Sequence, residues 1–268
     1  MKTFTPPRRQ GFWCNAIAGV SGRLRAGYLA MLLGAVVTPA HADEIIVSAA
    51  SSMTDAMTEV ARAYESAHPR TRVVLNFAAS DTLVRQLRNG APVDVLVTAD
   101  SESMDRAARQ QLLAAGSRID IASNQLVLIT PSGATQPPRQ LQDLLHPRYR
   151  RLCWGDPASV PAGRYAVAAL KREALDRRLA ARVVLAQNVR QCLNYVARGE
   201  VDAGFVFATD ARPGRVRIAL PVASPLPIRY PAALAARSPN ATAGRGFLAF
   251  LQSPAGRQLL SRHGFLPP

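Results

Sequence analysis

The stretch at residues 44–53, EIIVSAASSM, decides the fold. Its first five residues have the apolar pattern of a buried strand, and a turn of alanine and serine follows. From Met53 to about Ala67, apolar residues recur at helical spacing. A strand that passes through a small-residue turn directly into a helix is typical of an α/β sheet covered by helices. In such sheets ligands bind beyond the carboxyl ends of the strands, where turns lead into helices.

The same alternation of strand and helix continues along the chain. Strand patterns at 72–77 and 93–98 enclose a helical pattern at 82–88, and another helical pattern follows at 101–115. A second set has strands at 125–130, 151–154 and 203–207, with helices at 163–172 and 189–198. Strands at 216–220 and 228–234 and helices at 244–251 and 254–263 close the chain. Because most strands are apolar on both faces, we expect parallel sheets with helices on each side.

The N-terminal segment has the pattern of a cleaved secretory signal over residues 1–42. Residues 1–25 are basic and lack acids, residues 26–37 are apolar, and Ala40-His41-Ala42 fits a signal-peptidase site. The apolar run is too short for a membrane span. The mature chain then begins near Asp43. Arg8-Arg9 leaves twin-arginine export open beside general secretion.

The chain is strongly basic, with a formal net charge of +15. Five cations and no acid lie in the predicted leader, so +10 belongs to the mature part. The arginines are scattered and do not form a basic helix or alternate with aromatic residues. We therefore interpret them as a solvated surface that attracts anions weakly, and we predict no nucleic-acid partner.

Two cysteines, Cys153 and Cys192, remain after the predicted leader with Cys14 is removed. In an oxidising compartment they form either one disulfide or two buried thiols, and the sequence leaves both open. Neither has the spacing of a metal site. We expect no direct protein–metal ligands and no cofactor.

Four predicted helix starts carry the candidate site: Ala50-Ser51-Ser52, residues 79–82, residues 160–163 and Asn188-Val189-Arg190. The first turn of a helix has N–H groups without intrahelical partners and a partial positive charge, so several such turns around one cavity bind an oxyanion. Ser52 and Ser80 add hydroxyls, although each also fits an ordinary N-cap. Ala162 and Val189 offer only their backbone N–H groups.

Several segments together resemble the periplasmic molybdate-binding protein family, the receptors of ABC-type molybdate importers. The segments occur in order over nearly all of the mature chain, and two of them in combination are highly specific, GAPVDVLVTAD and GDPASVPAGRYA. The full set is VSAASSM at 47–53, FAASDTLVRQ at 77–86, GAPVDVLVTAD at 90–100, GDPASVPAGRYA at 155–166, Asn188-Val189-Arg190, GFVFATDA at 204–211 and Tyr230-Pro231.

The resemblance implies a type II periplasmic binding protein with two α/β lobes, each with a mainly parallel sheet flanked by helices, and the ligand in the interlobe cleft. The implied lobes are residues 43–122 plus 213–268 and residues 123–212, with hinges near 122–123 and 210–213. It further implies a monomeric periplasmic receptor that binds molybdate and tungstate through neutral donors and delivers them to an ABC permease in the inner membrane.

Carried over by position, the family's hydroxyl donors fall on Ser52 and Ser80. Its backbone donors fall on Ala50 or a neighbour of it, Ala162 and Val189. The position of the family's tyrosine donor holds Phe207, which cannot donate a hydrogen bond. The site then has fewer donors, recruits a water, or prefers another anion; the Phe207 ring fits the core as well as the cleft. Asp81 also departs from the family, which commonly has a small neutral residue at this position, and its carboxylate repels an anion unless it is turned away to cap the helix.

Other functions fit the sequence less well. An enzyme is disfavoured because no Gly-x-Ser-x-Gly motif occurs and His68, His146 and His263 have no positions typical of a catalytic base. We therefore assign no catalytic residues. Sulfate, thiosulfate or another small anion remains an alternative ligand, and a ligand-free interaction module remains an alternative function.

Overall fold

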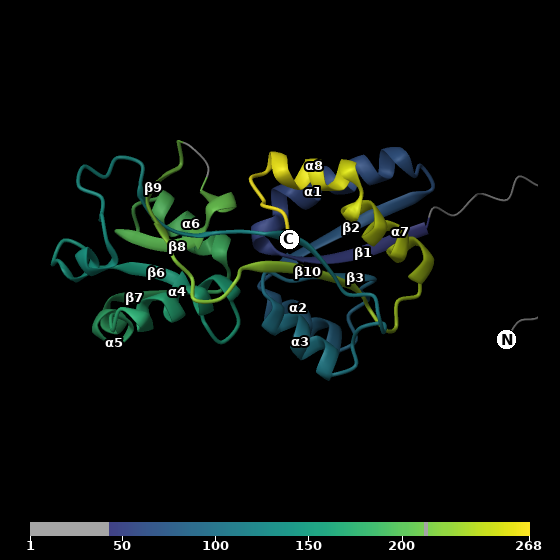
Figure 1. Ribbon diagram of the computed structural model, residues 1–268, viewed down its shortest axis with the longest axis horizontal. Helices are drawn as coiled ribbons and strands as arrows, with labels where there is room; N and C mark the ends of the chain where they lie inside the picture. The colour runs from purple at the N-terminus through teal and green to yellow at the C-terminus, as the bar shows by residue number, and fades with distance from the viewer. Residues whose placement is uncertain (1–42, 212–213) are drawn as a thin grey trace, which may run out of the picture. The chain divides into compact units, whose positions relative to one another are not determined.

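The computed structural model describes residues 43–211 and 214–268, which form two five-stranded sheets flanked by helices (Figure 1). The predicted leader at 1–42 and residues 212–213 of the predicted second hinge lie outside the described residues. The first sheet has the order β2-β1-β3-β10-β4, and the second has the order β7-β6-β8-β5-β9. The strands of the first sheet are β1 Asp43–Ala50, β2 Thr71–Ala78, β3 Val95–Val97, β4 Ile119–Ser123 and β10 Arg229–Leu234. Those of the second are β5 Leu126–Pro131, β6 Leu152–Gly155, β7 Val183–Ala186, β8 Ala203–Phe207 and β9 Val216–Val222.

Each sheet has four strands in one direction and one strand in the other. In the first sheet β2, β1 and β3 are parallel, and β10 is antiparallel to both β3 and β4. In the second sheet β7, β6 and β8 are parallel, and β5 is antiparallel to both β8 and β9. The two reversed strands, β10 and β5, are those that the chain enters after crossing from the other sheet. The predicted two-lobed fold with mainly parallel sheets is confirmed.

The strand pairing corrects one predicted boundary. The chain crosses between β4 and β5 at residues 124–125, next to the first predicted hinge. It returns between β9 and β10 at residues 223–228, because β9 pairs antiparallel with β5 along residues 216–222. The strand at 216–222, which the sequence analysis placed in the first lobe, therefore belongs to the second sheet. Asp210 and Ala211 link β8 to β9 within that sheet and do not cross between the sheets.

Helices cover both faces of each sheet and bury its apolar side chains. In the first lobe α1, α7 and α8 lie on one face and α2 and α3 on the other (Figure 1). In the second lobe α4 and α6 contact β6 and β8. The helices are α1 Thr54–Ala67, α2 Ser80–Arg88, α3 Ser101–Arg109, α4 Pro161–Arg172, α5 Asp176–Leu179, α6 Val189–Ala197, α7 Ala241–Gln252 and α8 Pro254–Arg262. Short 3₁₀ turns occur at η1 Ser51–Met53, η2 Leu141–Leu145, η3 Ala180–Arg182 and η4 Ala208–Asp210.

Cys153 on β6 and Cys192 on α6 form a disulfide, with their Cα atoms 5.7 Å apart. This settles the alternative that the sequence left open. Both residues are fully buried, and the bond ties α6 to β6, an inner strand of the second sheet. Because α6 begins at Val189, the disulfide also holds one of the predicted anion-binding turns in place.

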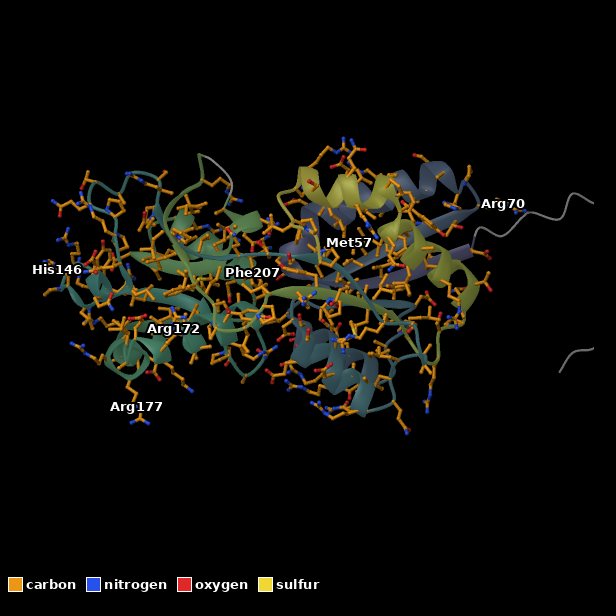
Figure 2. All side chains as sticks on the ribbon, viewed as in Figure 1. Met57, Arg70, His146, Arg172, Arg177 and Phe207 are labelled. Carbon is orange, nitrogen blue, oxygen red and sulfur yellow. A yellow bond between two sulfur atoms is a disulfide. The ribbon has the colours of Figure 1, made fainter. Side chains whose placement is uncertain are left out.

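Arginine side chains line the outer surface of both lobes. Figure 2 shows Arg70, Arg172 and Arg177 pointing away from the ribbon, and all three are exposed. This agrees with the interpretation of a solvated basic surface. Two other arginines, Arg164 and Arg190, are partly buried between the lobes.

Candidate functional site

A small cavity lies where the two sheets meet, and all five residues of the predicted site line it. About 10 Å³ of the cavity is open to the centre of a water-sized sphere, which is about the space of one water molecule. A cavity of this size excludes sugars and peptides. Its walls come from the turns that follow β1, β2 and β3, the start of α4, the start of α6 and the end of β8. The lining residues are Ala50, Ser51, Ser52, Ala78, Ala79, Ser80, Ala99, Val160, Pro161, Ala162, Val189 and Phe207.

Neither serine caps its own helix. The N-cap of α2 is Ala79 and that of α1 is Met53, and neither Ser80 nor Ser52 makes a capping hydrogen bond. The Ser80 Oγ instead accepts a hydrogen bond from the Ala99 N–H at 3.0 Å. The Ser80 oxygen is thereby occupied as an acceptor while its hydroxyl hydrogen stays available. The N-cap interpretation of these serines is wrong.

Two helix starts from the second lobe supply backbone donors. In α6 the Asn188 side chain caps the helix by accepting from the Gln191 N–H at 2.9 Å, which leaves the Val189 N–H in the first turn unused. In α4 the N-cap is Val160, which has no polar side chain. Within residues 43–211 and 214–268, no hydrogen-bond acceptor is found for the N–H of Ala162 or Val189. Buried N–H groups of this kind are rare without a partner.

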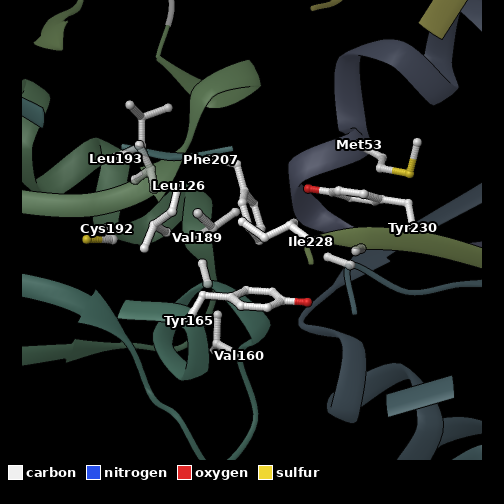
Figure 3. Packing of buried hydrophobic residues seen from close by; sticks show 14 of the residues in the cluster. Met53, Leu126, Val160, Tyr165, Val189, Cys192, Leu193, Phe207, Ile228 and Tyr230 are labelled. Atoms are coloured by element: carbon white, nitrogen blue, oxygen red, sulfur yellow. The ribbon is translucent and has the colours of Figure 1, made fainter. Parts of the chain in front are cut away.

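The Phe207 ring belongs to both the core and the cavity wall. Phe207 is almost fully buried and stands between Tyr165 and Tyr230, with ring centroids 6.1 Å and 5.8 Å away in edge-to-face arrangements (Figure 3). Burial raises the pKa of both tyrosines, so they stay protonated at neutral pH. Both alternatives that the sequence offered for the Phe207 ring are therefore true.

Asp81 does not face the cavity as a free charge, because arginine from the other lobe binds it. The Arg164 Nη1 lies 2.9 Å from Asp81 Oδ2, and Nη2 and Nε of the same guanidinium bind Asp100 Oδ2 at 2.5 and 2.9 Å. Arg164 Nη2 also donates to Ser103 Oγ at 2.8 Å. Burial alone lowers the pKa of the Arg164 guanidinium, but Asp100 and Asp81 outweigh that effect and raise the pKa. We call Arg164, Asp81 and Asp100 the α4 clasp.

A second ion pair between the lobes lies beside α6. The Arg190 Nη2 is 2.6 Å from Asp55 Oδ2 on α1, and Arg190 Nε is 2.9 Å from Asp210 Oδ1. Burial raises the pKa of Asp210 to about 7, and the nearby Arg190 opposes that rise. Arg164 and Arg190 each lie within two residues of a predicted backbone donor of the second lobe. Each pairs with an acid of the first lobe that lies close in sequence to Ser80 or Ser52.

Sequence analysis missed Arg164, Asn124 and the role of Tyr230. Asn124 lies in the crossing between the sheets, and its Nδ2 donates to the Tyr230 hydroxyl at 3.2 Å. That hydroxyl is 3.1 Å from Ser52 Oγ. These residues meet their partners only after the chain has folded, and although Arg164 and Tyr230 lie in segments that resemble the family, the resemblance gave them no role.

The rest of the described chain has features that bear on other functions. A larger hollow of about 720 Å³ opens on the surface of the second lobe beside Arg139, Arg148 and Arg217, and its lining is largely exposed. Among the described residues no His, Cys, Asp and Glu side chains are grouped as a metal site would require. None of the described helices is long and apolar enough to cross a membrane.

Comparison with known proteins places this geometry in context. Residues 45–266 match the family described as bacterial extracellular solute-binding protein. The molybdate-binding protein ModA of Haemophilus influenzae is 34% identical over 83% of this chain and 89% of its own length. ModA of Escherichia coli K12 is 33% identical over 94% of this chain and 97% of its own length.

Solved structures show the same fold. The periplasmic molybdate-binding protein of Azotobacter vinelandii superposes with a TM-score of 0.74 at 24% identity, covering 84% of this chain and 99% of its own. The sulfate-binding protein SubI of Mycobacterium tuberculosis superposes with a TM-score of 0.72 at 17% identity, covering 84% and 87%. Similar folds therefore occur in proteins named for two different oxyanions.

Proposed function

The chain belongs to the bacterial extracellular solute-binding proteins and, among them, to the molybdate-binding family, and from this premise we propose that it is a receptor for molybdate and tungstate. The family consists of solute-binding proteins, so the chain is not an enzyme. The oxyanion is its ligand and not a cofactor. One observation carries the proposal: serine hydroxyls and unused backbone N–H groups from both lobes line one small cavity.

In the proposed site, neutral donors replace the hydration shell of a dianion. Ser52 and Ser80 donate their hydroxyl hydrogens, and Ala162 and Val189 donate backbone N–H groups at the positive ends of α4 and α6. Hydrogen bonds to a charged group contribute about 1.5–3 kcal/mol each. Phe207 closes the wall without donating, so the chain has one donor fewer than the family pattern.

The arginines of the two ion pairs serve lobe closure in this proposal and do not bind the anion. Arg164 and Arg190 are occupied by carboxylates of the first lobe. They neutralise Asp81 and Asp55 beside the cavity and draw the lobes together. The lobes move about the crossings at 124–125 and 223–228, where the chain passes between the sheets.

We further propose the cellular setting that the family implies. The predicted leader directs export to the periplasm, where the monomeric receptor carries its anion to an ABC permease of the inner membrane without any nucleic-acid partner. The oxidising periplasm also suits the Cys153–Cys192 disulfide.

Calorimetric titration of the mature protein with molybdate, tungstate, sulfate and phosphate tests the proposal. We expect Kd values of about 1 μM or lower for molybdate and tungstate, and much weaker binding of the other two. Ser80→Ala should weaken molybdate binding about tenfold or more because a charge-assisted hydrogen bond is lost. Tight binding of sulfate alone would favour the alternative ligand, and binding of none of the four would reject the receptor function.

A further inference from the structure

A chain of buried hydrogen bonds leads from the crossing segment to the cavity. It runs from Asn124 to the Tyr230 hydroxyl and on to Ser52 Oγ, over distances of 3.2 and 3.1 Å. The three residues are buried, and Tyr230 has no exposed surface. Figure 3 shows Tyr230 beside Met53, with its hydroxyl pointing toward the side of Phe207.

The orientation of the Asn124 amide fixes the first step of this chain. Asn124 Oδ1 accepts from the Gln125 N–H at 2.8 Å, and Nδ2 lies 2.9 Å from Thr209 Oγ1. The group that faces Tyr230 is therefore the NH₂, which only donates. The Tyr230 oxygen consequently accepts from Asn124.

The second step follows from the single hydrogen of a phenol. Burial raises the pKa of Tyr230 well above its usual value, so the hydroxyl keeps its proton. Ser52 Oγ is the acceptor within reach of that proton in the described chain. When Tyr230 donates to Ser52, each of the three residues has a hydrogen-bond partner. The hydroxyl hydrogen of Ser52 is then directed into the cavity that Ser52 lines.

We propose that Asn124 and Tyr230 are positioning residues that make Ser52 an obligatory hydrogen-bond donor and so select oxyanions without a proton. This inference rests on the proposed oxyanion-binding function and deepens it. A free serine hydroxyl either donates or accepts. With one of its two lone pairs taken by Tyr230 and its hydrogen turned to the cavity, Ser52 is a poor acceptor for the hydrogen of a protonated anion such as hydrogenphosphate. In the same way, the Ala99 N–H occupies one lone pair of the Ser80 oxygen and leaves the Ser80 hydroxyl hydrogen for the cavity.

Tyr230→Phe tests the inference, with molybdate and inorganic phosphate titrated against the wild type and the variant. Without the phenol hydroxyl, Ser52 is free to turn. We expect the Kd of molybdate to rise about tenfold, whereas phosphate binding stays the same or improves. The preference for molybdate over phosphate should therefore fall about tenfold. Asn124→Leu, which removes the donor to Tyr230, should shift the preference in the same direction by a smaller factor.

Tyr64→Phe is the matched control. Tyr64 is also buried, and its hydroxyl donates to a backbone carbonyl, that of Ala243, at 3.4 Å, among His68, Phe247 and Phe250 and not at the cavity. We expect no change in either Kd. Thermal unfolding of each variant shows whether it is folded at the temperature of the titration.

The outcomes separate this inference from the proposed function. A folded Tyr230→Phe variant that binds molybdate within twofold of the wild type overturns the inference and leaves the receptor function intact. Equal losses for molybdate and phosphate also overturn it, because they indicate a merely structural role. If the wild type binds sulfate instead, the same comparison is made between sulfate and phosphate. A wild type that binds none of these anions rejects the proposed function and the inference with it.

Discussion

At the scale of single residues, Phe207 is the departure with the clearest consequence for binding. Its ring is held edge-on between Tyr165 and Tyr230. It lines the cavity with carbon only. A buried anion gains nothing from that part of the wall, and the remaining donors must compensate for its lost hydration.

Phe207→Tyr should therefore strengthen anion binding. A phenol hydroxyl at this position adds one donor to the wall, and a hydrogen bond to a charged group contributes about 1.5–3 kcal/mol. We expect the Kd of molybdate to fall about tenfold in a calorimetric titration. An unchanged Kd together with a lower melting temperature would show that the new hydroxyl disturbs the core and does not reach the anion.

The sequence predicted the cavity-lining residues but not their hydrogen-bond partners. Ser52 and Ser80 could be found because each lies at a strand-to-helix turn, which is a local pattern. Tyr230 lies 178 residues from Ser52 along the chain, and Arg164 lies 83 residues from Asp81. Tyr230 and Ser52 meet through the folding of the first lobe, and Arg164 and Asp81 meet through contact between the lobes, so no local pattern identifies these partners. The sequence also left open whether the Asp81 carboxylate repels the anion, and its pairing with Arg164 depends on contact between the lobes.

At the scale of secondary structure, the two helix starts of the second lobe each combine a donor with an arginine. The Ala162 N–H lies in the first turn of α4, and Arg164 follows it by two residues. The side chain of Arg164 reaches α2 and the N-cap of α3, so it joins three helix ends around one guanidinium. Removal of this arginine leaves two buried carboxylates without a counter-charge across the lobes.

Arg164→Met should lower both stability and affinity. Breaking a buried ion pair costs about 3–5 kcal/mol when a charge is left unpaired. Asp81 then keeps only its pair with Arg106 in the first lobe and repels the anion, so we expect the Kd of molybdate to rise at least tenfold. Urea unfolding and titration measure the two effects.

Arg106→Met is the matched control for the α4 clasp. Arg106 pairs with the same Asp81 oxygen at 3.4 Å, but it lies on α3 within the first lobe and is about a third exposed. A pair of this kind contributes about 0–1 kcal/mol. If Arg106→Met weakens binding as much as Arg164→Met, the effect comes from local charge and not from contact between the lobes.

The order of strands and helices was largely predictable, whereas their pairing was not. Runs such as EIIVS and VDVLVT identify β1 and β3 because both faces of these strands are buried. Nothing in residues 216–222 distinguishes an edge strand of the second sheet from a strand that returns to the first. Pairing with β5 decides it, and this contact depends on the crossing at 124–125.

At the scale of the whole molecule, charge and binding are separated in space. Residues 43–268 carry a formal net charge of +10, and exposed arginines such as Arg70, Arg172 and Arg177 point away from the lobes (Figure 2). The cavity itself is lined by uncharged side chains. Long-range attraction should therefore bring anions to the surface, whereas short-range hydrogen bonds hold them.

Because the surface charge and the cavity are separate, we expect salt to change the association rate constant of the anion and not its dissociation rate constant. Raising the ionic strength from about 0.01 M to 0.15 M shortens the Debye length from roughly 30 Å to 8 Å, which screens the surface charge but not an enclosed hydrogen bond. In stopped-flow measurements with molybdate we expect the association rate constant to fall several-fold and the dissociation rate constant to stay the same. The double variant Arg172→Ser and Arg177→Ser should lower the association rate slightly at low salt, again without changing dissociation. A dissociation rate that rises steeply with salt would mean that exposed arginines hold the anion, and the neutral cavity would not be the binding site.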